Sequence, residues 1–246
     1  MKYKTVEVKN VLRTQDMFSN LLGRSQITPG GGLIHGPAGN GKTTTVAYII
    51  NQLTSGGSLP IYVRCCATDT PSSFLARVAK ELGSEPLYPL RKSVDFIINT
   101  MNELQIALFV DEVDHIVGQA KTMETIRDIY DATEQPVILI GMEEIARRIS
   151  HRKQLFNRIS EWVEFQPADA EDVHMFATEL LEDGISVGED LLDYIRVRSG
   201  GEVRRILIAL EKIERFAKVN DQPYVDKEIW GDGQLFLNHG IHQGKR

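Results

Sequence analysis

Long apolar runs and cysteines are the features that this sequence has least of. No run of about 18 apolar residues occurs in its 246 residues, and the N-terminal stretch MKYKTVEVKNVLR lacks the apolar centre of a secretory signal. We therefore expect a cytoplasmic protein without a membrane segment. The two cysteines, Cys65 and Cys66, are adjacent on an expected buried strand, which excludes a disulfide framework and favours reduced thiols.

Positive charge is also scarce. The 28 Lys and Arg residues are outnumbered by 34 Asp and Glu residues, for a net charge of −6. This balance argues against coating nucleic acid by bulk charge, because Lys and Arg supply most non-specific affinity for DNA. A DNA contact would need a local basic stripe. The histidines show no metal-ligand pattern, since His239 and His242 lie in a Gly-rich tail without Cys or acidic partners.

The fold class follows from short apolar runs that alternate with longer helical patterns. Five runs indicate strands, at residues 32–35, 60–65, 106–110, 137–140 and 162–165. Repeated strand and helix units predict an α/β fold with a parallel sheet that helices cover on both faces. After Pro167 the pattern is helical only. We therefore predict an α/β domain over residues 1–166, a small all-α domain over residues 167–230 and a tail over residues 231–246.

A glycine-rich motif stands between the first expected strand and the helical pattern TTTVAYIINQL. GPAGNGKT fits the pattern GxxxxGK[ST] in its required context of strand, loop and helix. Glycines let the backbone wrap phosphates, Lys42 reaches the β- and γ-phosphates, and Thr43 ligates Mg²⁺. The alternative is a glycine-rich turn that matches by chance. We predict an ATP site in the α/β domain, formed by Gly36, Pro37, Ala38, Gly39, Asn40, Gly41, Lys42, Thr43 and Thr44.

Two acids end the third expected strand, in IALFVDEVDH over residues 106–115. An acid at the carboxyl end of this strand lies beside the phosphate loop, so Asp111 can hold the metal ion through water and Glu112 can polarise the attacking water. The alternative is an acidic helix cap. A phosphate loop needs a metal ligand, and this favours the functional interpretation.

Two arginines stand where they could reach phosphate groups. Arg158, in QLFNRISEWVEF, precedes the last strand and could point toward a neighbouring subunit's γ-phosphate. Arg204, in SGGEVRRI, begins the third C-terminal helix and could reach back to its own nucleotide. The planar guanidinium group suits phosphate oxygens, although a solvated surface arginine is the alternative for each. On the residues alone, a phosphate contact and a surface charge both remain open for each arginine.

The order of GPAGNGKT, LFVDE, a strand ending at Gly141, FNRI and GEVR resembles an AAA+ ATPase over residues 30–210. The segments DE-x-DH, VILIGMEEI and QLFNRISEWVEFQP resemble the MuB and TnsC group, the target-selecting ATPases of transposing phages and transposons. The resemblance implies a P-loop NTPase with a five-stranded sheet and a helical lid, an arginine finger at Arg158 and a sensor-2 arginine at Arg204. It also implies ATP-dependent homo-oligomers, as rings or filaments, that assemble on double-stranded DNA and recruit a transposase.

The sequence departs from this group in two places. The fourth strand of relatives usually ends in a polar side chain that places the attacking water, whereas here Gly141 and Met142 follow the strand. The sensor-1 role is then vacant or falls to Glu143, and we expect slow, DNA-stimulated hydrolysis. MuB-like proteins often carry an extra helical DNA-binding domain ahead of the ATPase, whereas here the first helix is expected near Thr14, so DNA contact has to come from the ATPase body.

Candidate DNA contacts lie in the loops after the second and third strands, which face the pore in this architecture. Thr70 comes from the first loop, and Lys121 and Thr122 come from the second. Hydroxyl and ammonium groups bind backbone phosphates without reading the base sequence. For Thr70 the alternative is helix capping, because Pro71 follows at an expected helix start.

Two other functions remain open. An ORC/Cdc6-like initiator or loader ATPase shares the GxxR motif and the finger position, but it normally brings a C-terminal winged helix, for which the stretch after the third C-terminal helix is short. A regulatory P-loop protein that binds ATP without hydrolysing it is the other alternative.

Overall fold

The computed structural model describes residues 1–25, 27–133, 135–231 and 233–236, and it divides the chain into two compact units. The sheet unit consists of residues 10–37 and 42–165, and the helical unit consists of residues 1–9, 38–41 and 166–246. The division after residue 165 lies next to the boundary predicted at 166. Residues 1–9 and 38–41, however, group with the helical unit. The predicted tail, with His239 and His242, lies largely outside the described residues.

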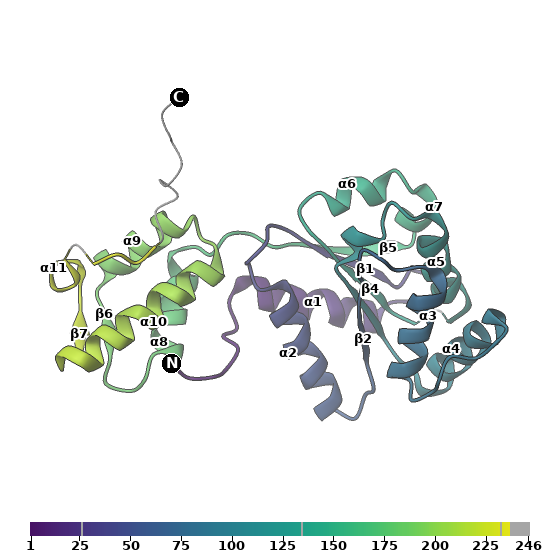
Figure 1. Ribbon diagram of the computed structural model, residues 1–246, viewed down its shortest axis with the longest axis horizontal. Helices are drawn as coiled ribbons and strands as arrows, with labels where there is room; N and C mark the ends of the chain where they lie inside the picture. Colours follow the sequence, from purple (N-terminus) through teal and green to yellow (C-terminus); the bar gives the residue numbers. More distant parts are fainter. Residues whose placement is uncertain (26, 134, 232, 237–246) are drawn as a thin grey trace. The chain divides into compact units, whose positions relative to one another are not determined.

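The sheet unit contains five strands in the order β2-β3-β4-β1-β5, and every neighbouring pair is parallel (Figure 1). The strands are β1 (Gly31–His35), β2 (Ile61–Arg64), β3 (Leu108–Asp111), β4 (Val137–Ile140) and β5 (Ile159–Glu164). The predicted α/β fold with a parallel sheet is confirmed. Strand β5 begins earlier than predicted, because Gly31 pairs with Ile159 and a bulge follows before Gly32 pairs with Glu161.

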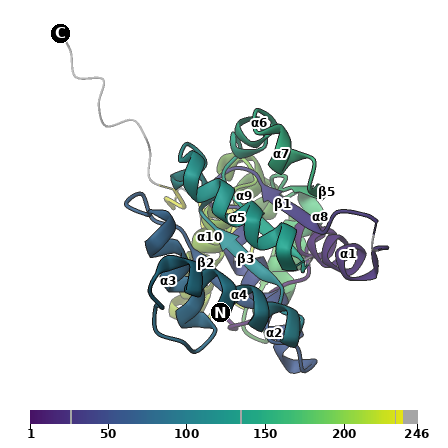
Figure 2. The same cartoon turned by 90° about the vertical axis from the view of Figure 1, so that its right-hand side faces the viewer.

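Helices cover both faces of this sheet, as predicted. The helices are α1 (Lys9–Gly23), α2 (Lys42–Ser55), α3 (Pro71–Glu81), α4 (Leu90–Leu104), α5 (Ala120–Thr133), α6 (Ile145–Ser150) and α7 (Lys153–Phe156). Side chains alternate along each strand, so Leu108 and Val110 pack with α3, α4 and α5, whereas Phe109 packs with α1 and α2. Figure 2 looks onto the α3, α4 and α5 side of this unit. Because the strands are parallel, the carboxyl ends of β1, β3 and β4 lie at the same end of the sheet.

The helical unit contains the three helices predicted after Pro167 and further elements that the sequence pattern did not reveal. They are α8 (Ala170–Leu180), α9 (Glu189–Ser199), α10 (Val203–Asn220), the short helix α11 (Lys227–Trp230) and a pair of parallel strands, β6 (Ser186–Val187) and β7 (Tyr224–Val225). The N-terminal residues belong here because the Lys2 N–H donates to the Leu180 carbonyl at 2.6 Å. Within the described ranges, no helix combines the length and apolarity needed to cross a membrane.

Candidate nucleotide-binding site

The phosphate loop connects the carboxyl end of β1 to the first turn of α2. Gly36, Gly39 and Gly41 all have positive φ, at 145°, 80° and 86°. A Cβ atom at Gly36 would lie 2.7 Å from the Phe165 carbonyl oxygen, so both the backbone conformation and the space require glycine there. The Lys42 ammonium donates to the carbonyls of Gly36 and Pro37 at 2.7 and 2.9 Å. Burial lowers the pKa of Lys42, against the opposing charges of Asp111 and Asp114.

Asp111, at the end of β3, accepts three hydrogen bonds through its carboxylate. It is buried, and its Oδ2 atom accepts from the Thr43 hydroxyl at 2.8 Å and from the Tyr62 hydroxyl at 2.7 Å. Its Oδ1 atom accepts from the Glu112 N–H at 2.7 Å. Burial and the bond to Asp111 raise the pKa of Tyr62, which therefore stays a donor. The predicted magnesium ligands Thr43 and Asp111 are thus in direct contact.

Glu112 follows in a left-handed backbone conformation, with φ 55°, which is strained for a residue with a side chain. Its carboxylate is held by two neighbours, since Arg64 at the end of β2 donates to Oε1 and His115 Nε2 lies 3.3 Å from Oε2. The hydrogen bond from Arg64 lowers the pKa of Glu112. The predicted base is therefore ionised, and both of its oxygens face cationic or polar partners.

The carboxyl end of β4 is occupied by an acid from another element. Asp114, in the 3₁₀ turn Val113–His115 after Glu112, accepts the Met142 N–H at 2.6 Å through Oδ2. A Cβ atom on Gly141 would lie 2.7 Å from this same oxygen and 2.8 Å from Ile145 Cγ1. The polar side chain that the sequence lacks at this strand end is replaced in space by Asp114, whereas Glu143 is exposed.

The residues at this end of the sheet fit a nucleotide and a magnesium ion. The first N–H groups of α2 have no partner inside the helix, and the loop brings the Lys42 ammonium beside them. The hydroxyl of Thr43 and the carboxylate of Asp111 are the hard oxygen ligands that Mg²⁺ prefers. Among the described residues no group of three or more His, Cys, Asp or Glu side chains could hold a metal by itself. A cation here would take its other ligands from phosphate and water.

Arg204 lies at the start of α10 in the helical unit, which also contains residues 38–41. Its N–H donates to the Gly39 carbonyl at 3.0 Å, and its side chain is exposed. Inside this unit a Cβ atom on Gly39 would lie 2.4 Å from Glu202 Oε1. Gly39 therefore combines a positive φ with a close approach to Glu202. Asn40, also in the loop, is buried, and its Oδ1 atom has no partner among the described residues.

Arg158 immediately precedes β5, at the amino ends of the strands, whereas the phosphate loop lies at their carboxyl ends. Its guanidinium donates to both oxygens of Asp131 on α5, and Nη1 donates to the Gln154 carbonyl at 2.7 Å. The bond to Asp131 raises the pKa of Arg158. Arg158 is thus away from its own phosphate loop, and its guanidinium is bonded within its own chain.

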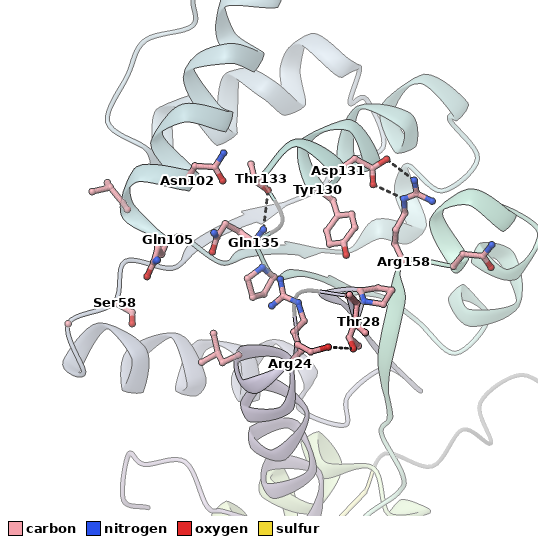
Figure 3. Close-up of a pocket in the computed structure, with 18 residues that line it drawn as sticks. Arg24, Thr28, Ser58, Asn102, Gln105, Tyr130, Asp131, Thr133, Gln135 and Arg158 are labelled. Atoms are coloured by element: carbon pink, nitrogen blue, oxygen red, sulfur yellow. Dashed lines mark hydrogen bonds and ion pairs between the residues drawn. The ribbon is translucent and has the colours of Figure 1, made fainter.

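A cavity of about 980 Å³ opens at this same end of the sheet, beside Arg158 (Figure 3). Its lining includes the residues that precede β2, β3 and β4, among them Ser58, Gln105 and Gln135. Because the nucleotide chemistry belongs to the carboxyl ends of the strands, this cavity is not the nucleotide site.

The predicted DNA contacts do not form one surface. Lys121 is exposed at the start of α5, but Thr122 is fully buried and its hydroxyl donates to Gln119 Oε1. The prediction that Thr122 contacts DNA is therefore wrong. Thr70 caps α3: its Oγ1 accepts from the Ser73 N–H, and Ser73 Oγ accepts from the Thr70 N–H. This is the capping alternative, since the hydroxyl is already used by the helix end.

Sequence patterns missed four residues of the site. Tyr62 and Arg64 contact Asp111 and Glu112 only because β2 pairs with β3 in a register that sets Arg64 opposite Asp111. His115 and Asp114 were visible in the motif DE-x-DH, but their partners Glu112 and Met142 depend on the turn and on β4. The alternating pattern of IYVR was the available signal for Tyr62 and Arg64, and it did not specify the register.

Comparison with known proteins identifies the class of this chain. Residues 26–149 match the AAA domain family. This match spans half of the chain, and the chain belongs to that family. Together with the parallel sheet, the phosphate loop and the strand-end acids, it defines an AAA+ P-loop NTPase fold.

Relatives by sequence are more specific. The chain is 26% identical to an ORC1-type DNA replication protein of Thermoplasma volcanium, over 86% of this chain and 57% of the relative. It is 23% identical to ORC1-type DNA replication protein 2 of Thermoplasma acidophilum, over 80% of this chain and 54% of the relative. The chain thus spans a little over half the length of these relatives.

Solved structures share the fold. The chain superposes on the Aeropyrum pernix ORC1 protein in complex with DNA with a TM-score of 0.65 at 17% identity, over 93% of this chain and 64% of the other. The Thermotoga maritima RuvB Holliday junction branch migration motor gives a TM-score of 0.60 at 16% identity, over 91% of this chain and 67% of the other. At these identities the likeness establishes the fold.

Proposed function

We propose that this protein is an ATPase that binds ATP with Mg²⁺, forms homo-oligomers on double-stranded DNA and acts there as an initiator or loader of the ORC1/Cdc6-like type. The observation that carries the ATPase part is the 2.8 Å contact between Thr43 and Asp111, which joins the phosphate loop to the strand-end acid. The similarity to two ORC1-type replication proteins supports the DNA-dependent part.

The roles of the residues follow from their places. Lys42 would bind the transferred phosphate, and Thr43 and Asp111 would hold the metal ion. Mg²⁺, when bound, would neutralise charge on the phosphates. Glu112 would accept a proton from the attacking water, and its lowered pKa keeps it ionised for that task. Arg204 would approach the nucleotide of its own chain, and Arg158 that of a neighbour.

Two substitutions test the ATPase site. Lys42→Ala removes the ammonium that faces the phosphates and should abolish tight ATP binding. Glu112→Gln keeps the shape of the side chain but removes the base, so ATP should stay bound while turnover falls by about 10²- to 10⁴-fold. Equilibrium binding of a fluorescent ATP analogue and phosphate release measure the two effects. Lys92→Ala, on the exposed start of α4, is the matched control. Unchanged ATP affinity in folded Lys42→Ala protein would refute the site.

Target selection for a transposase, of the MuB type, is the second candidate. The segments DE-x-DH, VILIGMEEI and QLFNRISEWVEFQP favour it. Both candidates require ATP-dependent assembly on DNA, but a target selector covers DNA without sequence preference and an initiator occupies discrete sites. Electron microscopy with ATP and a plasmid distinguishes them: continuous rings or filaments along the plasmid support target selection, and particles at fixed positions support initiation.

The binding-only alternative has its own signature. A regulatory P-loop protein would bind ATP and release no phosphate, with or without DNA. Phosphate release above that of the Glu112→Gln variant excludes this alternative.

A further inference from the structure

The segment from Ile145 to Lys153 carries an unusual concentration of positive charge for a chain with a net charge of −6. It reads IARRISHRK, with no acid, and we call it the basic segment. It forms α6 and the start of α7, which lie next to each other in the sheet unit (Figure 1, Figure 2). Its exposed side chains are Arg147, Arg148, Ser150, His151 and Lys153.

Two arginines of the basic segment are fastened to the turn that follows Glu112. Arg152 donates to the Val117 carbonyl through Nε at 2.9 Å and through Nη2 at 2.6 Å. Arg148 Nη1 lies 3.3 Å from the Asp114 carbonyl. Carbonyl oxygens are neutral, so these bonds fix the guanidinium groups in place without cancelling their charge. The basic segment is therefore a cationic surface that is hydrogen-bonded to the turn after Glu112.

The two acids just before this segment are fewer than its four Arg and Lys residues, so the surface keeps a net positive charge. Glu144, just before α6, pairs with Arg147, and Glu143 beside it is exposed. The Asp114 carboxylate accepts the Met142 N–H and lies beside Gly141, at the start of the basic segment. Lys121 adds a further exposed cation at the start of α5, three residues beyond Gly118, whose Cβ position lies 3.8 Å from Arg148 Nη2.

We propose that the basic segment and Lys121 contact the phosphate backbone of double-stranded DNA, and that Arg148 and Arg152 transmit this contact to the turn that holds Glu112. This proposal rests on the DNA-dependent ATPase function proposed above and specifies where DNA binds. The exposed arginines and lysines outnumber the acids beside them and suit phosphate oxygens, and such contacts give affinity without sequence information. The surface supplies the local basic stripe that an acidic chain needs in order to bind DNA.

The double variant Arg147→Gln with Lys153→Gln tests the surface. Both side chains are exposed, and neither bonds to the turn. The matched control is Arg13→Gln with Lys80→Gln, which removes the same charge from exposed positions on α1 and α3. Binding of a fluorescein-labelled DNA duplex of mixed sequence is measured by anisotropy with ATP over a range of salt concentrations. Thermal unfolding verifies that both variants are folded.

We expect the test variant to lose about tenfold in DNA affinity, and the slope of log affinity against log salt to fall by about 0.9 for each phosphate contact removed. The control should retain wild-type affinity. Equal losses of DNA affinity in both variants, or no loss in the test variant, would overturn the proposal that this surface binds DNA. Loss of ATP-dependent self-association with unchanged DNA affinity would assign the surface to a second copy of this chain and would also overturn it.

The transmission has a separate test in Arg152→Lys, which keeps the charge but cannot form the two-pronged bond to Val117. DNA affinity should stay within about twofold of wild type, while the change in phosphate release caused by DNA should shrink. If DNA changed phosphate release by this variant as much as by the wild type, the proposal that Arg152 transmits DNA binding to the turn would be wrong. Wild-type protein that binds no duplex in any nucleotide state would contradict the proposed function itself, whereas wild-type binding with an unaffected double variant contradicts only the surface.

Discussion

Asp131 holds Arg158 with both of its carboxylate oxygens: Nε donates to Oδ1 at 2.6 Å and Nη2 donates to Oδ2 at 2.8 Å (Figure 3). The carbonyl oxygen of Gln154 accepts a hydrogen bond from Nη1, the third nitrogen of this guanidinium. An arginine that is to serve a neighbouring subunit has to leave this arrangement first. Asp131 therefore competes with any phosphate that Arg158 would bind.

Asp131→Asn should make assembly easier. The amide keeps the shape of the side chain but removes the charge, and both partners are about one-third exposed. An exposed pair of this kind contributes about 0.2–1 kcal/mol, so the protein concentration at half-maximal ATPase activity should fall by about 1.4- to fivefold. The rate of phosphate release against protein concentration measures the shift. A lower maximal rate at an unshifted midpoint would instead assign Asp131 to orienting Arg158.

Arg158→Ala should leave ATP binding by the isolated chain intact and lose assembly-dependent hydrolysis. An arginine supplied in trans is worth about 10³ to 10⁵ in rate in GTPases, and we expect a smaller loss here because Gly141, without a side chain, follows β4. Mixing this variant with Lys42→Ala restores interfaces in which an intact Lys42 faces an intact Arg158. Recovered phosphate release in the mixture supports a shared site, and full activity of Arg158→Ala alone would make the arginine a surface charge.

Arg64→Gln should change how hydrolysis depends on pH. Arg64 lowers the pKa of Glu112, so the carboxylate stays ionised to a lower pH than an ordinary glutamate. Without Arg64 the pKa of Glu112 rises, the carboxylate takes up a proton at a higher pH, and the acidic limb of the rate profile moves upward in pH. At neutral pH the freed carboxylate should raise the rate without DNA. Arg91→Gln, an exposed arginine on α4, is the control, and an unmoved acidic limb in Arg64→Gln would exclude Glu112 as the titrating base.

Gly141→Ala should destabilise the sheet unit. The added Cβ would lie 2.7 Å from Asp114 Oδ2 and 2.8 Å from Ile145 Cγ1, and overpacking of this kind costs about 1–3 kcal/mol. Gly118→Ala is the matched control, since the nearest atom to its Cβ position is Arg148 Nη2 at 3.8 Å. Urea unfolding measures both variants. Equal stability of the two variants would show that the end of β4 adjusts to the methyl group.

Local patterns predicted the parts of the site that are local in sequence. The phosphate loop from Gly36 to Thr43 and the acids Asp111 and Glu112 were visible because the required residues are consecutive and stand between a strand and a helix. The partners of these residues come from elsewhere. Arg64 reaches Glu112 through the pairing of β2 with β3, and Asp114 reaches Met142 through the position of β4. Such contacts depend on register, which alternation of apolar residues along single strands does not fix.

The same reasoning explains the errors among the DNA contacts. A threonine in an expected loop was taken to be exposed, but α5 begins at Ala120, and Thr122 then falls on its buried face. The short helices α6 and α7 were not predicted, because four to six residues give too little periodicity to be recognised. The basic charge that they carry was therefore not seen as one surface.

Strand β1 runs from the amino end to the carboxyl end of the sheet, between β4 and β5. At one end the Gly31 N–H donates to the Arg158 carbonyl at 2.9 Å, and at the other end the chain enters the phosphate loop at Gly36. Five extended residues span about 15 Å, and β4 and β5 clamp this length from both sides. If a neighbouring subunit displaced the backbone at Arg158, the paired strand β1 would link that displacement to the glycines of the phosphate loop. The NMR chemical shift of the Gly31 amide, measured as the protein concentration is raised, would report a change in its hydrogen bond to Arg158.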